Sequence, residues 1–182
     1  MSARGARPIE HAEAAQYRKP LLAYDGSPGA DRALDIAIEL ASNSHGRLTI
    51  LTATARIPFL AFTGAAPEAV NELRRTLIGE AERTLCRAVD RIPQGISVTK
   101  ILSRKPIREA LQQRASAGEH DLMILGSRGR GPIRTALFGG LGRDMVRRSP
   151  VPVLIVNPGV NEDEQPERVP QAQLVPMTPK RA

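Results

Sequence analysis

The chain has 182 residues, of which 41% are apolar, 25% charged and 3% aromatic. That length suits one compact domain with some sequence left over, and the composition excludes collagen-like and wholly disordered chains. The formal net charge of +7 comes almost entirely from arginine, with 22 Arg against 4 Lys. Single-strand nucleic-acid binders interleave aromatic and basic residues, and this chain has too few aromatics to do so, so we do not expect a nucleic-acid partner.

The first half of the chain alternates between strand and helix patterns. Residues 1–18 lack apolar periodicity and are expected to be a flexible N-terminal extension. A short apolar run is then ended by the turn sequence Asp25-Gly26-Ser27, and Ser27 followed by Pro28 is typical of a helix start. Apolar spacing predicts strands at about 19–24 and 48–53 and helices at about 28–44 and 68–92.

The second half continues the alternation and ends in a proline-rich tail. The predicted elements are strands at 96–102, 121–125 and 151–156 and helices at about 106–118 and 140–148. Pro152 has no N–H to donate to a ladder, so the fifth strand should lie at a sheet edge. Residues 158–182 combine prolines with mixed charges and are expected to form a flexible C-terminal tail.

The β-α-β alternation predicts an α/β domain over residues 19–157, with a five-stranded parallel sheet covered by helices on both faces. The single cysteine, Cys86, is expected to be a small buried residue on an apolar helix face. The three histidines are far apart and give no zinc pattern. Because the N-terminus lacks a signal-type apolar stretch and no apolar run is long enough to span a bilayer, we expect a cytoplasmic protein without a membrane partner.

A glycine- and arginine-rich segment after the fourth strand carries the strongest functional signal. Residues 126–142 contain six glycines, which let main-chain amides approach a ligand closely. Residues 139–142 offer no Ser, Thr, Asp or Asn to cap the next helix, so its free amides stay open to an external anion. Six arginines and a single acid, Asp144, lie between residues 126 and 148. The local chemistry therefore predicts an anion site.

Two better-known phosphate motifs do not fit this segment. A third glycine of a dinucleotide fingerprint would fall at Arg134, and the segment follows the fourth strand rather than the first. No Gly-Lys-Ser/Thr triplet is present, which excludes a Walker loop. A purely structural interpretation, in which the glycines only permit tight turns and close packing, stays open.

The pattern resembles the universal stress protein family of small α/β nucleotide-binding domains. Gly126-x2-Gly129-x9-Gly139 matches the spacing of that family's glycine motif. The apolar strand that ends in Asp25-Gly26-Ser27 and the ending at residues 148–156 are also typical, and the similarity covers roughly residues 18–157.

The resemblance implies a Rossmann-like, adenine nucleotide alpha hydrolase-like fold with strand order 3-2-1-4-5 and a crevice between strands one and four. It implies ATP, or else ADP or AMP, as ligand, with Mg²⁺ near Asp25 and held indirectly. An Asp-Gly turn offers a plainer role for Asp25. The implied binding residues are Ala23, Asp25, Ala53, Leu125, Gly126, Arg128, Gly129, Gly139, Gly140 and Leu141.

The chain departs from the family pattern at two positions. Gly140 stands where the motif has Ser or Thr, and Gly142 where a second hydroxyl is common. Two lost hydrogen bonds to a charged group would weaken ATP binding by about a hundredfold or more.

The first hypothesis is a dimeric, stress-response ATP-binding module with an unidentified protein partner and little or no hydrolysis. The second is a homodimeric interaction protein that binds no nucleotide. A hydrolase would need Asp25 to hold Mg²⁺. The homodimer is expected through the edge strand at 151–156.

Overall fold

Strands and helices alternate along the described chain, as the sequence predicts. The computed structural model describes residues 17–55, 66–127 and 140–157. The elements are β1 (Pro20–Ala23), α1 (Pro28–Asn43), β2 (Arg47–Ala53), α2 (Pro67–Asp90), β3 (Ser97–Ser103), α3 (Ile107–Ser116), β4 (Leu122–Gly126), α4 (Gly140–Arg148) and β5 (Val153–Val156). Residues 1–16 and 158–182, for which flexible extensions are predicted, lie outside the described residues.

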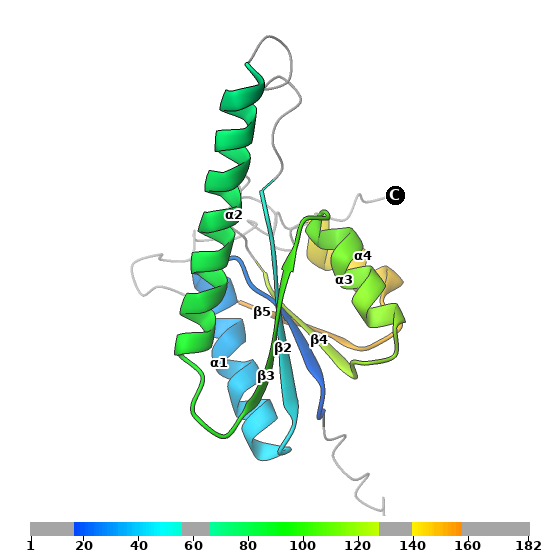
Figure 1. Cartoon of the computed structure of the whole chain (residues 1–182). Coiled ribbons are helices and arrows are strands. Elements are labelled where there is room, and N and C mark those ends of the chain that lie inside the picture. Colours follow the sequence, from blue (N-terminus) through cyan, green and yellow to red (C-terminus); the bar gives the residue numbers. More distant parts are fainter. Residues whose placement is uncertain (1–16, 56–65, 128–139, 158–182) are drawn as a thin grey trace, which may run out of the picture.

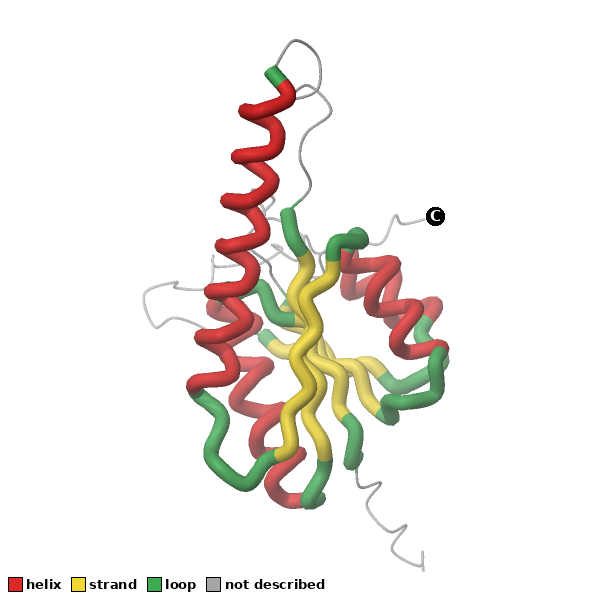
Figure 2. Tube along the Cα trace, in the orientation of Figure 1, coloured by secondary structure: helices red, strands yellow, loops and turns green. Residues whose placement is uncertain are grey.

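The five strands form one parallel sheet in the order β3-β2-β1-β4-β5. This arrangement confirms the predicted fold class and strand order, with β5 at one edge. β1 has only four residues but lies at the centre, paired with β2 on one side and β4 on the other. Helices α1 and α2 cover one face of the sheet, and α3 and α4 cover the other (Figures 1 and 2).

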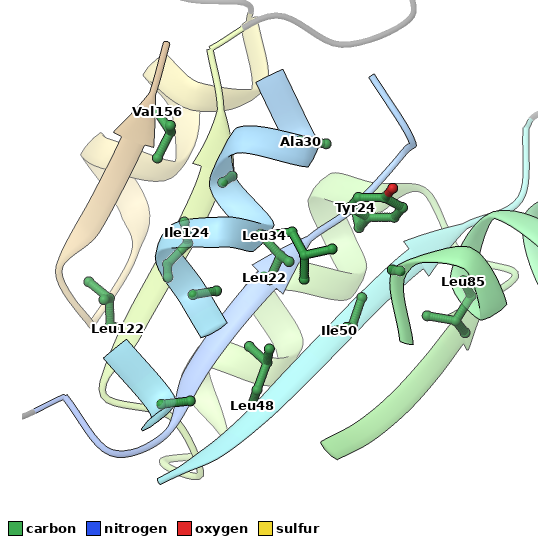
Figure 3. Packing of buried hydrophobic residues seen from close by; sticks show 14 residues of the cluster. Leu22, Tyr24, Ala30, Leu34, Leu48, Ile50, Leu85, Leu122, Ile124 and Val156 are labelled. Atoms are coloured by element: carbon green, nitrogen blue, oxygen red, sulfur yellow. The ribbon is translucent and has the colours of Figure 1, made fainter. Parts of the chain in front are cut away.

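Alternate residues of each strand supply the two cores. Leu22 points into the cluster under α1, where it is fully buried with Leu34, Ile50 and Ile124 (Figure 3). Its neighbour Leu21 belongs to the opposite cluster, under α3 and α4. Because both faces are buried, the central strands read as nearly continuous apolar runs in the sequence.

The start of α1 is fixed by its own residues. The Ser27 hydroxyl accepts a hydrogen bond from the Ala30 N–H at 3.2 Å, and Pro28 occupies the first turn. The Asp31 N–H bonds to the Ser27 carbonyl at 2.8 Å. Helix α1 therefore satisfies these N-terminal donors internally, which matters for where an anion can bind.

Two details differ from the sequence predictions. β5 begins at Val153, not at residue 151, because Pro152 contributes only its carbonyl, which accepts from the Met123 N–H at 2.9 Å. The expectation that Cys86 is buried is wrong, since its side chain is exposed on α2. Helix α2 has 24 residues, and its N-terminal half extends past the sheet (Figure 1), where Leu73 remains 37% exposed.

Candidate ligand crevice

A cavity of about 520 Å³ opens at the carboxyl ends of the neighbouring strands β1 and β4. The helix after β1 lies on one face and the helix after β4 on the other, so their connections diverge at this point. Ligands of open α/β sheets bind at such a switch point. The cavity is therefore the candidate functional site.

The structure brings most of the predicted binding residues that it describes to this cavity. Those that line it are Ala23, Asp25, Ala53, Leu125, Gly126 and Leu141. Gly140 is the first residue of α4, is exposed and does not line the cavity, although Gly142 two residues later does. Arg128, Gly129 and Gly139 lie outside the described residues.

Asp25 stabilises the turn that leads into α1. Its Oδ1 accepts a hydrogen bond from the Ser27 N–H at 3.0 Å, and Gly26 between them has a φ of 71° that suits glycine. This is the plainer structural role that the sequence left open for Asp25. The same residue is exposed and lines the cavity, so the turn role and a ligand role are compatible.

Gly126 is required by packing within the fold. A Cβ atom at this position would lie 2.7 Å from the carbonyl carbon of Gly29 and 2.8 Å from the nitrogen of Ala30. The end of β4 therefore touches the backbone of the first turn of α1, and no larger residue fits. A structural role for this glycine was one of the alternatives left open by the sequence, and it applies here.

One wall of the cavity is apolar and built from small side chains. Besides the predicted alanines, it includes Ala55, Pro106 and Ile107, which the sequence analysis missed. These residues come from the ends of β2 and the β3–α3 connection, so only the folded sheet shows that they meet. The strand ends are fixed by hydrogen bonds from the Thr52 hydroxyl to the Tyr24 carbonyl and from the Thr54 N–H to the Ser103 carbonyl, each at 2.9 Å. This wall suits a flat, weakly polar group.

The other side of the cavity is formed by the start of α4. Leu141 and Gly142 bring the first turn of α4 to it, and residues 140–142 offer no side-chain cap. Arg143 follows on the same turn and is exposed. The Asp144 carboxylate forms ion pairs with Arg108 at 2.8 Å and with Arg148 at 3.1 Å. A negatively charged group is favoured beside this helix start.

Ser127 also lines the cavity and was missed by the sequence analysis. Its N–H donates to the Val156 carbonyl at 2.7 Å, while its hydroxyl lies buried and has no hydrogen-bond partner in the described part of the chain. Because buried hydroxyls are normally paired, a polar ligand group in the cavity would suit it. The only sequence signal was its position between Gly126 and Arg128.

The described residues contain no cluster of three or more His, Cys, Asp or Glu that could hold a metal ion. Within residues 17–55, 66–127 and 140–157, no helix is long and apolar enough to cross a bilayer.

The fold and the crevice together define a doubly wound α/β protein with a ligand site at its switch point. The model of the universal stress protein family matches residues 16–157. A universal stress protein of Thermus aquaticus is 31% identical over 140 residues, which cover 77% of this chain and 98% of the relative. The chain therefore belongs to the universal stress protein family, which confirms the resemblance.

Solved structures of the same family share the fold. A universal stress protein in complex with cAMP is 25% identical, with a TM-score of 0.55 over 80% of this chain and 100% of that one. A universal stress protein family protein from Arabidopsis thaliana with AMP bound is 19% identical, with a TM-score of 0.58 over 82% of this chain and 96% of that one.

Proposed function

We propose that this chain is a stress-response module that binds an adenine nucleotide of the ATP type in the crevice and hydrolyses it little or not at all. The crevice carries the proposal, because it joins a wall of small apolar side chains to the start of α4 at the switch point, where residues 140–142 have no capping side chain. An adenine ring suits the first, and phosphates suit the second. The cAMP complex of a related protein supports a nucleotide of this class.

The proposed placement puts the base beside Ala53 and the phosphates beside Gly126 and the start of α4. Asp25 lies near the ribose and, through phosphate oxygens, near a Mg²⁺ ion. ATP could instead be hydrolysed if a group activated water. The described acid that lines the crevice is Asp25, and its carboxylate is already hydrogen-bonded to the Ser27 N–H. This arrangement favours holding the nucleotide over cleaving it.

Titration of the purified chain with ATP, ADP and AMP by calorimetry, with and without Mg²⁺, tests the proposal. We expect saturable binding of at least one of these nucleotides, and a Mg²⁺ effect that is lost in Asp25→Asn. Absence of heat and of any thermal shift at millimolar nucleotide would contradict it. Steady phosphate release from ATP that disappears in Asp25→Ala would show a hydrolase instead.

A second candidate function is a homodimeric interaction protein whose crevice holds no nucleotide. The glycines at 140 and 142, where the family pattern has hydroxyl residues, are the observation that favours it. The same calorimetric titration separates the two functions, because only the nucleotide-binding module gives a saturable signal.

We also propose that the chain forms homodimers through the β5 edge, a surface that includes residues 151–156. β5 is the last strand of the sheet, and Val153, Leu154 and Ile155 are only partly buried. An unpaired apolar edge tends to recruit another strand. Sedimentation velocity should show a dimer at micromolar concentration, and a monomer there would contradict the proposal.

We propose a folded domain that is shorter than the chain, in a protein of the cytoplasm. We place the domain at residues 19–157, with extensions on either side, and expect limited proteolysis to trim the chain to about that core. Cleavage inside β1 or β5 at the earliest time points would contradict these limits. The cytoplasm stays the predicted location, and fractionation of the native host tests it.

A further inference from the structure

A second hollow, of about 740 Å³, lies at the other end of the strands, near the amino ends of β1, β2 and β3. It shares no lining residue with the crevice. Helices α3 and α4 lie on this face, and α3 contacts β1 and β2. Ile101 of β3 packs against the cluster under α3, whereas Ser97 and Thr99, nearer the start of β3, are exposed, which leaves that part of the sheet open.

The floor of this hollow carries hydroxyl groups. Thr49 and Thr99 are register partners on β2 and β3, and Ser97 lies two residues before Thr99 on the same face. Thr99 and Ser97 are exposed, whereas Thr49 is 3% exposed. Hydroxyl groups can donate hydrogen bonds to an anion.

The rim of the hollow is cationic. Arg18, Lys19, Arg47 and Arg114 line it, and Glu119 is the acidic residue among the lining side chains. The Glu119 Oε2 atom lies 3.8 Å from Arg114 Nη1, which makes this a long ion pair. Lys19 and Arg47 make no ion pair with any residue in the described ranges. Positive charge therefore exceeds negative charge at this rim.

The chain holds the rim in place. The Asp121 carboxylate accepts hydrogen bonds from the Arg18 N–H at 2.7 Å and the Lys19 N–H at 2.9 Å. The Arg47 N–H donates to the Arg18 carbonyl at 2.8 Å, and Gly46 packs so closely on that carbonyl that no side chain fits there. Two like-charged segments are thus fixed side by side, and a multivalent anion would relieve their repulsion.

The shape and chemistry of the hollow favour a small phosphate compound over a larger polymer. Residues from four separate chain segments line it, and apart from His45 and His120 the lining has no ring side chain on which a nucleic-acid base could stack. Arginine guanidinium groups pair phosphate oxygens two at a time. We propose that this hollow is a second anion site, which binds a small polyphosphate between its hydroxyl floor and cationic rim.

Residue-resolved NMR titration with inorganic tripolyphosphate in about 0.15 M salt tests this proposal, since simple surface attraction is largely screened there. We expect saturable shifts of the amide signals of Gly46, Arg47 and Gly118. Removing one charged hydrogen-bond donor, in Lys19→Gln or Arg47→Gln, should weaken binding at least about tenfold. Arg83→Gln, which removes the same charge from the exposed face of α2, should leave the affinity unchanged.

Three results would overturn the proposal. Shifts confined to the crevice, at residues such as Ala53 and Ser127, would place the anion at the nucleotide site. Equal weakening by Arg83→Gln would reduce the effect to general attraction by the net charge. Tighter binding of a hexaglutamate peptide or a short DNA strand than of tripolyphosphate would assign the hollow to another partner class. Because the two sites share no residue, nucleotide binding at the crevice can succeed or fail independently.

Discussion

Restoring a hydroxyl at the start of α4 should strengthen ATP binding, and Gly140→Ser is the substitution that does so with least disturbance. A Cβ atom at Gly140 would have Arg108 Nη2 as its nearest neighbour, at 3.9 Å, which is ordinary contact distance. The residue is exposed and helical. The fold should therefore accept Ser or Ala equally well.

The expected size of the effect follows from one hydrogen bond to a charged group. Such a bond contributes about 1.5–3 kcal/mol, or roughly a 10- to 150-fold lower Kd. Both substitutions remove glycine flexibility from the unfolded chain, a change of about 1 kcal/mol or less. Because Gly140→Ala shares that change and lacks the hydroxyl, the ratio of the two affinities isolates the hydrogen bond.

Calorimetric titration of wild type, Gly140→Ser and Gly140→Ala with Mg-ATP measures this ratio. We expect the serine variant to bind tightest and the alanine variant to bind close to wild type. Equal affinities in the two variants, or weaker binding by serine, would refute the placement of phosphate at this helix start. Gly142→Ser is a harder test, since its Cβ would lie 3.2 Å from Ile155 Cδ1 and that side chain must move.

Three stability predictions follow from packing and burial, each measured by denaturant unfolding. Gly126→Ala should lower the unfolding free energy by about 1–3 kcal/mol through overlap with the α1 backbone, whereas Gly79→Ala, with no atom within 4 Å, should raise it by about 0.5–1 kcal/mol. Equal effects would refute the contact. Thr52→Val should cost about 1–2 kcal/mol, because it removes the buried hydroxyl that bonds the carbonyl at the end of β1; an unchanged midpoint would contradict this. Burial lowers the pKa of His120 below 6.5. The Lys19 backbone, Glu119 and Asp121 raise this pKa by smaller amounts, and Arg114 lowers it further. As the pH falls, the imidazole of His120 is therefore protonated in the unfolded chain before it is protonated in the folded one. Stability should therefore fall as the pH drops below 6.5, and this fall should be smaller in His120→Gln; an equally steep fall in that variant would contradict the assignment.

The fold was predictable from the sequence because its signals are local. Apolar runs marked the buried strands, Ser27 and Pro28 marked the start of α1, and Pro152 indicated an edge strand. The same local logic was wrong for Cys86, because the buried stripe of this part of α2 runs through Ala81, Leu85 and Ala88 and Cys86 lies outside it, on the exposed side of the helix.

The crevice was predictable only in part. Asp25 and Gly126 follow directly from strand ends and turn residues, and the family resemblance added the alanines of β1 and β2. Pro106 and Ile107 join the cavity through the β3–α3 connection, which no local pattern relates to β4. The contact of Gly126 with α1 was equally invisible, since the two segments are about a hundred positions apart in the sequence. Because of that contact, Gly126→Val would disturb the fold itself as well as any ligand in the crevice.

Mapping ATP onto the folded chain by residue-resolved NMR shows whether the nucleotide binds in the crevice. We expect saturable shifts of the amide signals of residues at the carboxyl ends of the strands, namely Ala53, Leu125, Ser127 and Leu141. The signals of Gly46 and Gly118, at the amino ends, should change only through weaker binding of ATP at the second hollow. No saturable change at Ala53 or Leu125 at millimolar ATP would contradict binding in the crevice. So would changes at Gly46 and Gly118 that begin at a lower ATP concentration than those at Ala53 and Leu125.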